Sequence, residues 1–243
     1  MPVEAPLLAA IAFAGALIFG ITGFGSALIT IPLATHFVPL PFALALFAVV
    51  DLSSALAVGL ENPKNAVRAE WTRLVPMILA GTALGVTLLV HLPRATGMLL
   101  LGIFVISYAL YSLLRRASTR VIRAGWGWVA GLCGGITSTL FGAGGPPYAI
   151  YLSHRGLTKE QFRATMGFAT MTSISVRVVA FLLTGSLLDS RVWMIALLAV
   201  PGGLTGIFVA KKLFKRISRD MLLRLVALLL LASGGSLLVR AIG

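Results

Sequence analysis

Two charged residues stand apart from the other charges of this 243-residue chain because they lie well inside long apolar segments. They are Asp51 and Arg177, whereas the remaining Lys, Arg, Asp and Glu residues fall in loops or at segment ends. A charge in an apolar environment is costly, so such residues usually line a polar cavity or pair with each other. Three roles follow: a structural ion pair, an Arg177 that binds an anion, and an Asp51 that carries a proton or a cation.

Two glycine-rich interruptions offer a second source of anion contacts. They are Gly20-Ile-Thr-Gly-Phe-Gly25 and Phe141-Gly-Ala-Gly-Gly-Pro-Pro147. Glycine adopts conformations that other residues avoid and proline suits the first turn of a helix, so each stretch predicts a half-helix, a break and a second half-helix. The restarting helices would direct N–H groups and a partial positive charge at a common centre, which favours a small oxyanion. The alternative for these glycines is close helix packing.

The candidate substrate-binding residues come from these breaks and from nearby hydroxyl groups. At the breaks they are Thr22, Gly23, Phe24, Gly25, Ser26, Gly142, Ala143, Gly144 and Gly145. Ser53 and Ser173 are added because they match across a repeat described below, although hydroxyls in membrane helices usually bond to their own preceding turn. Tyr148 either donates to a substrate or packs against its neighbours, and Arg177 completes the set.

The composition predicts that these residues lie in a membrane. Hydrophobic residues make up 58% of the chain, charged residues make up 11% and mean hydropathy is +1.00. An ordinary soluble domain is about 25% charged, so a soluble enzyme and a disordered chain are both excluded. The net charge of +13 matches a membrane protein whose cytoplasmic loops gather Lys and Arg, and does not indicate nucleic acid. With Cys133 as the single cysteine, we expect no disulfide, metal or cofactor.

Eight hydrophobic elements emerge from a search for runs of about 20 apolar residues. They cover residues 5–38, 41–60, 73–91, 95–114, 124–153, 160–183, 191–210 and 220–241. The first has no basic flank, so we expect it to belong to the mature protein and not to a signal peptide. The sequence therefore predicts an all-α, polytopic membrane protein.

The two breaks lie about 119 residues apart, and other landmarks recur at nearly the same offset. Leu33 falls on Leu152, Phe42 on Phe162, Ser53 on Ser173, and the glycine pair Gly81 and Gly85 on Gly202 and Gly206. We assign these two glycine pairs to helix packing. The recurrence predicts an internal duplication, with repeats at residues 1–120 and 121–243 that form one integral membrane domain.

The positive-inside rule predicts how the two repeats are oriented. Loop 115–123 carries four basic residues and loop 211–224 carries six, so both belong inside. If each of the three elements between these loops crossed the membrane once, the loops would lie on opposite sides, which conflicts with their charge. The conflict disappears if the fifth element is a re-entrant hairpin. The first element is its counterpart in the other repeat, so we expect it to be a re-entrant hairpin too. Each half is then a re-entrant hairpin and three spanning helices, and the halves are inverted, which is typical of a transporter with a central site.

The breaks resemble those of the TauE/SafE sulfite exporter family. The resemblance rests on the segment from Gly20 to Leu33, on Leu140 to Pro147, and on Phe162-Arg-Ala-Thr165 with the later Arg177, and it extends over the whole chain. It implies a multi-pass bacterial inner-membrane transporter that exports sulfite or small organosulfonate anions, driven by the proton gradient. The implied partners are the anion, protons and the lipid bilayer. A homodimer is one option for the oligomeric state.

These features predict a secondary transporter with alternating access around a midplane site between two broken helices, with Asp51 coupling transport to a proton or a cation. A passive anion channel fits the breaks about as well but leaves Asp51 without a role. An intramembrane enzyme would need a nucleophile and a base on facing helices. Cys133 and Ser138 have no histidine at membrane depth to activate them, so we do not expect an enzyme.

Overall fold

The computed structural model describes residues 4–114, 121–213, 231 and 235. Across these residues the chain forms helices and no strand, which confirms the all-α prediction. The elements are α1 (Ala5–Thr22), α2 (Ser26–Ala34), α3 (Leu40–Gly59), the short 3-10 helix η1 (Pro63–Asn65), α4 (Arg68–His91), α5 (Arg94–Leu114), α6 (Trp126–Phe141), α7 (Gly145–Ser153), α8 (Lys159–Leu183) and α9 (Ser190–Leu213). Five of the described helices, namely α1, α3, α4, α8 and α9, are long and apolar enough to cross a membrane.

The predicted boundaries agree with these helices with one clear exception. Helices α1 and α2 fall within the first predicted element, and α6 and α7 fall within the fifth. Helix α4 begins at Arg68, five residues before the predicted start at residue 73. The eighth predicted element, 220–241, lies outside the described residues except for Leu231 and Gly235.

The turns that follow α1 and α6 require glycine. Gly23 and Gly142 end these helices with φ angles of 81° and 72°, and Gly25 has a φ of 92°. An L-residue with a side chain rarely adopts such angles, whereas glycine does so without steric cost. After the turns, α2 begins at Ser26 and α7 at Gly145. Prolines in the first turn of α7 suit that position because no N–H is needed there.

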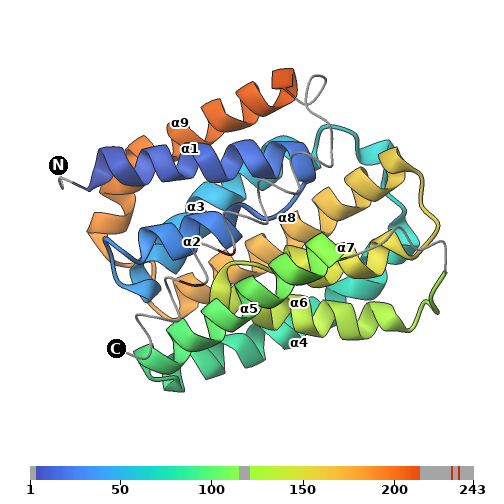
Figure 1. Cartoon of the computed structure of the whole chain (residues 1–243), viewed down its shortest axis with the longest axis horizontal. Coiled ribbons are helices and arrows are strands. Elements are labelled where there is room, and N and C mark those ends of the chain that lie inside the picture. The colour runs from blue at the N-terminus through green and yellow to red at the C-terminus, as the bar shows by residue number, and fades with distance from the viewer. Residues whose placement is uncertain (1–3, 115–120, 214–230, 232–234, 236–243) are drawn as a thin grey trace.

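The helices form two packing units that are visible in Figure 1. In the α1 unit, α1 lies beside α9 and both contact α3, while α2 packs on α1 and α3. In the α6 unit, α6 lies beside α4 and both contact α8, while α7 packs on α6 and α8. The two units meet mainly along α3 and α8. Each unit therefore combines helices from both halves of the sequence.

Glycines bring the helices of each unit into backbone contact. A Cβ atom added to Gly81 of α4 would lie 2.3 Å from the carbonyl oxygen of Leu132 in α6. One added to Gly206 of α9 would lie 2.4 Å from the carbonyl oxygen of Phe13 in α1. Gly85 and Gly202 make similar close approaches to α6 and α1. The assignment of these four glycines to packing is therefore confirmed.

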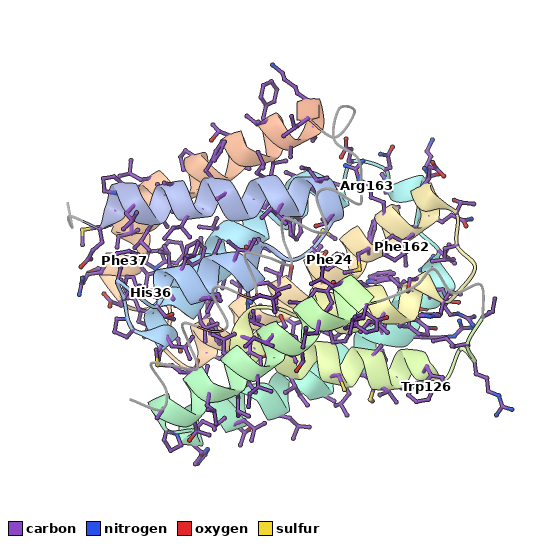
Figure 2. All side chains as sticks on the ribbon, viewed as in Figure 1. Phe24, His36, Phe37, Trp126, Phe162 and Arg163 are labelled. Atoms are coloured by element: carbon purple, nitrogen blue, oxygen red, sulfur yellow. The ribbon has the colours of Figure 1, made fainter. Side chains whose placement is uncertain are left out.

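Helix α5 covers the turns where the two units face each other. Phe104 of α5 stacks on Phe141 at the end of α6, with 5.4 Å between ring centroids. Tyr108 of α5 meets Phe24 edge-on at 6.4 Å. Phe24 lies near the middle of the molecule in Figure 2. Apolar side chains on the outer faces of α4 and α9, such as Leu84 and Phe208, are exposed as expected of a surface in contact with lipid.

Adding a methyl group at the glycine contacts tests this packing. We expect Gly81→Ala and Gly206→Ala each to lower the free energy of unfolding by about 1–3 kcal/mol, because the new Cβ atom meets backbone atoms that cannot move aside. Gly125→Ala is the matched control, since a Cβ atom there has no neighbour within 4 Å. Thermal unfolding of the detergent-solubilised protein measures the difference. Unchanged stability of Gly81→Ala would contradict the packing.

Candidate functional site

A small cavity lies between the α1–α2 turn and the α6–α7 turn. Its lining residues are Phe19, Phe24, Gly25, Ser26, Ala27, Asp51, Ser138, Gly142, Ala143, Gly144, Gly145, Tyr148, Thr170, Ser173 and Ile174. The two turns are in contact, because a Cβ atom added to Gly145 would lie 2.5 Å from Cβ of Phe24. The volume of about 20 Å³ accommodates about one water molecule. In this structure the cavity therefore has no room for an anion larger than a water molecule.

Ten of the candidate site residues line this cavity, and four do not. The lining candidates are Phe24, Gly25, Ser26, Asp51, Gly142, Ala143, Gly144, Gly145, Tyr148 and Ser173. Thr22, Gly23, Ser53 and Arg177 are outside the lining. Arg177 is nevertheless adjacent, since its Nη1 would lie 3.0 Å from a Cβ atom added to Gly142.

Asp51 and Arg177 form a buried ion pair at this cavity. Arg177 Nη2 lies 3.1 Å from Asp51 Oδ2, and the two residues are 1% and 3% exposed. Ser26 Oγ donates to Asp51 Oδ1 at 2.6 Å. Arg177 Nη1 donates to the carbonyl oxygen of Ser138 at 2.9 Å, while Nε has no hydrogen-bond partner among the described residues. The Nε–H of the guanidinium group is therefore buried without an acceptor among these residues.

The ion pair forms because α3 and α8 run antiparallel at close range. A Cβ atom added to Gly167 of α8 would lie 3.2 Å from Cα of Gly59 in α3. Asp51 precedes Gly59 by about two turns and Arg177 follows Gly167 by nearly three, so the antiparallel direction brings both side chains to about the same level. Small residues at the crossing point therefore place the two charges opposite each other.

The backbone N–H groups of the two turns fall into two sets. Gly23 donates to Phe19 O at 2.7 Å and Phe24 donates to Thr22 Oγ1 at 3.3 Å. Gly142 and Ala143 both donate to Thr137 O. These bonds complete the ends of α1 and α6, as helix C-termini commonly require. The other set lies at the starts of α2 and α7, where N–H groups have no carbonyl acceptor in their own helix. The candidates in this set are Gly25, Ser26, Gly144 and Gly145.

The hydroxyl groups of the candidate residues have two kinds of partner, another side chain at the cavity or the backbone of their own helix. Tyr148 donates from its hydroxyl to Ser173 Oγ at 3.0 Å, and both residues are buried. The Tyr148 ring packs on Gly134, where an added Cβ atom would lie 2.0 Å from Cε1. Ser53 instead donates to Val50 O at 2.7 Å, within its own helix. Ser53 and Ser173, matched in the sequence, therefore have different surroundings.

Ser138 and Thr170 line the cavity although they were not among the candidates. Ser138 lies in the last turn of α6, where the last four carbonyl oxygens have no partner within the helix. Its carbonyl accepts the hydrogen bond from Arg177. A cation at the C-terminal end of a helix is favourable, so this bond also stabilises the turn. The carbonyl oxygens at the end of α6 that lack a partner within the helix are the signal that could have indicated this contact.

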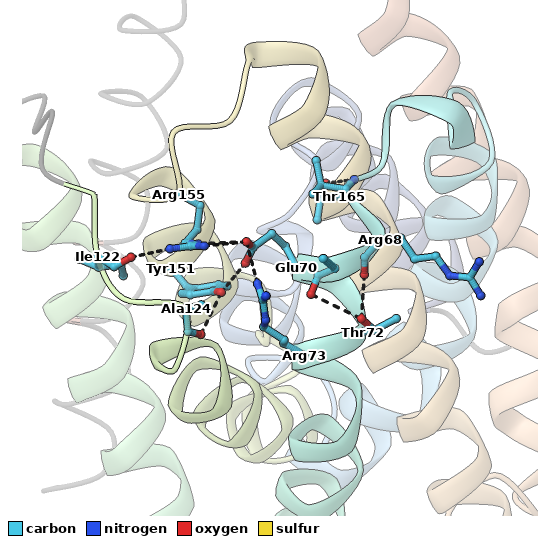
Figure 3. A network of polar contacts seen from close by, with 11 residues as sticks. Arg68, Glu70, Thr72, Arg73, Ile122, Ala124, Tyr151, Arg155 and Thr165 are labelled. Carbon is cyan, nitrogen blue, oxygen red and sulfur yellow. Dashed lines mark hydrogen bonds and ion pairs between the residues drawn. The ribbon is translucent and has the colours of Figure 1, made fainter.

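A second polar cluster surrounds Glu70 and explains the early start of α4 (Figure 3). Glu70 is 5% exposed and accepts hydrogen bonds from Arg73 Nη1 at 2.9 Å, from Arg155 Nη2 at 2.9 Å and from the Tyr151 hydroxyl. Arg155 Nη1 also donates to Ile122 O at 2.5 Å. The hydrogen bond to Glu70 raises the pKa of Arg155. The cluster joins α4, the end of α7 and the segment before α6, so it stabilises the α6 unit away from the cavity.

Comparison with known proteins identifies related transporters. The model of the sulfite exporter TauE/SafE family matches residues 7–237. A probable inner membrane transporter protein, TsaS of Comamonas testosteroni, is 26% identical over 168 residues, which cover 68% of this chain and 69% of that protein. No solved structure matches the chain.

Removal of the Glu70 charge tests the second cluster. We expect Glu70→Gln to lower the free energy of unfolding by about 3 kcal/mol, because Arg155 and Arg73 lose their buried anionic partner. Glu61→Gln is the control, since its ion pairs with Arg163 and Lys211 are about one third exposed and such pairs contribute about 0–1 kcal/mol. Thermal unfolding in detergent compares the two variants, and equal losses would rule out a special role for Glu70.

Proposed function

This chain belongs to the TauE/SafE sulfite exporter family, and from that premise we propose that it is a secondary transporter of sulfite or a small organosulfonate anion in the bacterial inner membrane. The proposed mechanism is alternating access with coupling to protons. The family and the TsaS relative are described as transporters, which agrees with the expectation that the chain is not an enzyme.

The observation that carries this proposal is the convergence of three positive groups on one cavity. The first residues of α2 and α7, Ser26 and Gly145, both line the cavity. The N-terminal end of a helix carries a partial positive charge and N–H groups without acceptors. Arg177 lies beside the same cavity and bonds to Asp51. Such a combination suits a small oxyanion better than a cation or a neutral molecule.

We assign the proposed site residues according to their contacts. Direct anion contacts are expected from Arg177, from the N–H groups of Gly25, Ser26, Gly144 and Gly145, and from the hydroxyls of Tyr148 and Ser173. Thr22, Gly23, Phe24, Gly142 and Ala143 shape the two turns, since their hydrogen-bonding groups already complete the ends of α1 and α6. Ser53 has the weakest support because its hydroxyl bonds within α3.

The packing of the helices supports the proposed inverted repeat of residues 1–120 and 121–243. If α1 corresponds to α6, α3 to α8 and α4 to α9, then each contact has a counterpart: α1 with α9 matches α6 with α4, and α3 with α9 matches α8 with α4. The equivalent helices α3 and α8 run antiparallel, as inverted copies in a membrane require. In this proposal α1–α2 and α6–α7 are the re-entrant elements of the two repeats.

The cavity also bears on the choice between a transporter and a channel. A conducting channel needs a continuous aqueous path, whereas this cavity holds about one water molecule and is bordered by the buried Asp51–Arg177 pair. So small a site is expected for one state of an alternating-access cycle. We therefore favour a transporter over a passive channel.

Removal of the Arg177 charge tests the anion site. We expect Arg177→Gln to reduce saturable flux of radiolabelled sulfite into proteoliposomes by at least about tenfold, because a hydrogen bond to a charged group contributes about 1.5–3 kcal/mol. Arg68→Gln is a matched control, since Arg68 is exposed and extends away from the Glu70 cluster in Figure 3. Flux is measured with a pH gradient of either sign. Unchanged flux in Arg177→Gln would contradict the site assignment.

The re-entrant topology has its own test. In a Cys133→Ser background, we expect Phe37→Cys and Asp189→Cys to react with a membrane-impermeant maleimide added outside the cell, and Lys64→Cys to react only after permeabilisation. Phe37 lies at the opposite end of the molecule from Arg163 (Figure 2), and all three positions are exposed. Labelling of Phe37→Cys only from inside would mean that α1 and α2 together cross the membrane.

A further inference from the structure

The Asp51–Arg177 pair has a special position because it connects the two packing units. Asp51 belongs to α3 in the α1 unit and Arg177 to α8 in the α6 unit. The neighbouring bonds stay within one unit: Ser26 to Asp51 in the first, and Arg177 to Ser138 and Tyr148 to Ser173 in the second. The buried ion pair is therefore the polar contact that joins the units at the cavity.

The carboxylate of Asp51 already occupies part of the proposed anion site. It accepts hydrogen bonds from Ser26 Oγ, on the first residue of α2, and from Arg177 Nη2. A sulfonate or sulfite oxygen can accept from the same two donors, because both ligands are oxyanions that accept hydrogen bonds from a guanidinium and from a helix start. A substrate that binds Arg177 Nη2 and the Ser26 hydroxyl therefore competes with Asp51.

The net charge of the buried site determines whether an anion can replace the Asp51 carboxylate at Arg177. With Asp51 ionised, Arg177 neutralises it and the site has no net charge. A singly charged anion would then add a full negative charge, which the partial positive charges at the starts of α2 and α7 offset only in part, and the remaining charge is unfavourable in a buried site. Among the described residues, Arg177 from α8 is the charged group that contacts Asp51, and Tyr148 from α7 is the other titratable group that lines the same cavity. Helix α2 presents the hydroxyl of Ser26. A proton on Asp51 restores neutrality.

We infer that Asp51 is an internal anion that the substrate displaces from Arg177, with uptake of one proton by Asp51 for each singly charged anion bound. This inference rests on the proposed function and concerns its coupling. The exchange removes the buried ion pair between the α1 unit and the α6 unit, so binding of anion and proton weakens a contact that must break when the units move relative to each other. Proton and anion then cross together, so transport of a singly charged substrate carries no net charge. An inward proton gradient would drive such cotransport inward, in contrast to the proton-driven export that the family resemblance implies.

The pH dependence of anion binding tests this exchange. Methanesulfonate is the probe, because its charge does not change over the pH range used. For the purified full chain, titration calorimetry should give a Kd that rises about tenfold per pH unit once Asp51 is ionised in the free protein. Asp51→Asn, which resembles the protonated carboxyl group, should bind with a Kd that is independent of pH. Asp189→Asn is the matched acid-to-amide control, since Asp189 is exposed, and it should keep the wild-type slope.

A second variant tests the same exchange if Asp51→Asn does not fold. Ser26→Ala keeps both charges but removes the hydroxyl that stabilises the ionised carboxylate. The pH above which its Kd for methanesulfonate begins to rise should be about one unit higher than in the wild type, because Asp51 then holds its proton more readily. Loss of the hydroxyl as a donor to the anion changes the magnitude of Kd but not this pH. A wild-type Kd independent of pH, or an Asp51→Asn slope equal to that of the wild type, would overturn the exchange while leaving the anion site intact. Failure of the wild type to bind both methanesulfonate and sulfite would overturn the proposed function together with the exchange.

Discussion

A charge in apolar surroundings must be neutralised, and the Asp51–Arg177 pair meets this requirement at the contact between the two packing units. The rest of the site follows from it. Ser26 at the start of α2 satisfies one carboxylate oxygen, and the carbonyl of Ser138 at the end of α6 satisfies one guanidinium nitrogen. The pair therefore holds one helix end from each unit against the same cavity.

The glycine contacts make such a site possible by keeping each unit compact. Gly81 and Gly206 bring α4 onto α6 and α9 onto α1 at backbone distance. Lipid tails are as apolar as the helix side chains, so the hydrophobic effect does not drive helices together within a membrane. Their association depends instead on close van der Waals packing. The contact between units is different, since α3 and α8 approach closely at Gly59 and Gly167 and join through a charge pair. Exchange of one charge partner can alter that contact without unfolding either unit.

Much of the helix content could be predicted, but several contacts of the site could not. The start of α4 was placed too late because Glu70 and Arg73 look like loop charges, and the burial of Glu70 depends on Arg155, 85 residues later in the chain. The turns were located correctly in the sequence, yet the N–H groups of Gly142 and Ala143 are consumed by Thr137 O. Ser53 and Ser173 match in sequence, but only Ser173 reaches the cavity and the Tyr148 hydroxyl.

The sequence by itself determined the class of the molecule, its apolar helices, the positions of the two glycine turns and the identity of the two isolated charges. These properties are local: apolar length, backbone freedom at glycine and the cost of a charge in an apolar segment can be judged within one stretch of chain. Only the tertiary structure decided that Asp51 meets Arg177, that α4 packs on α6 and α9 on α1, and which N–H groups remain for a ligand. Those outcomes depend on contacts between residues far apart in the chain, whose partners are selected by packing and by hydrogen bonding in the folded molecule.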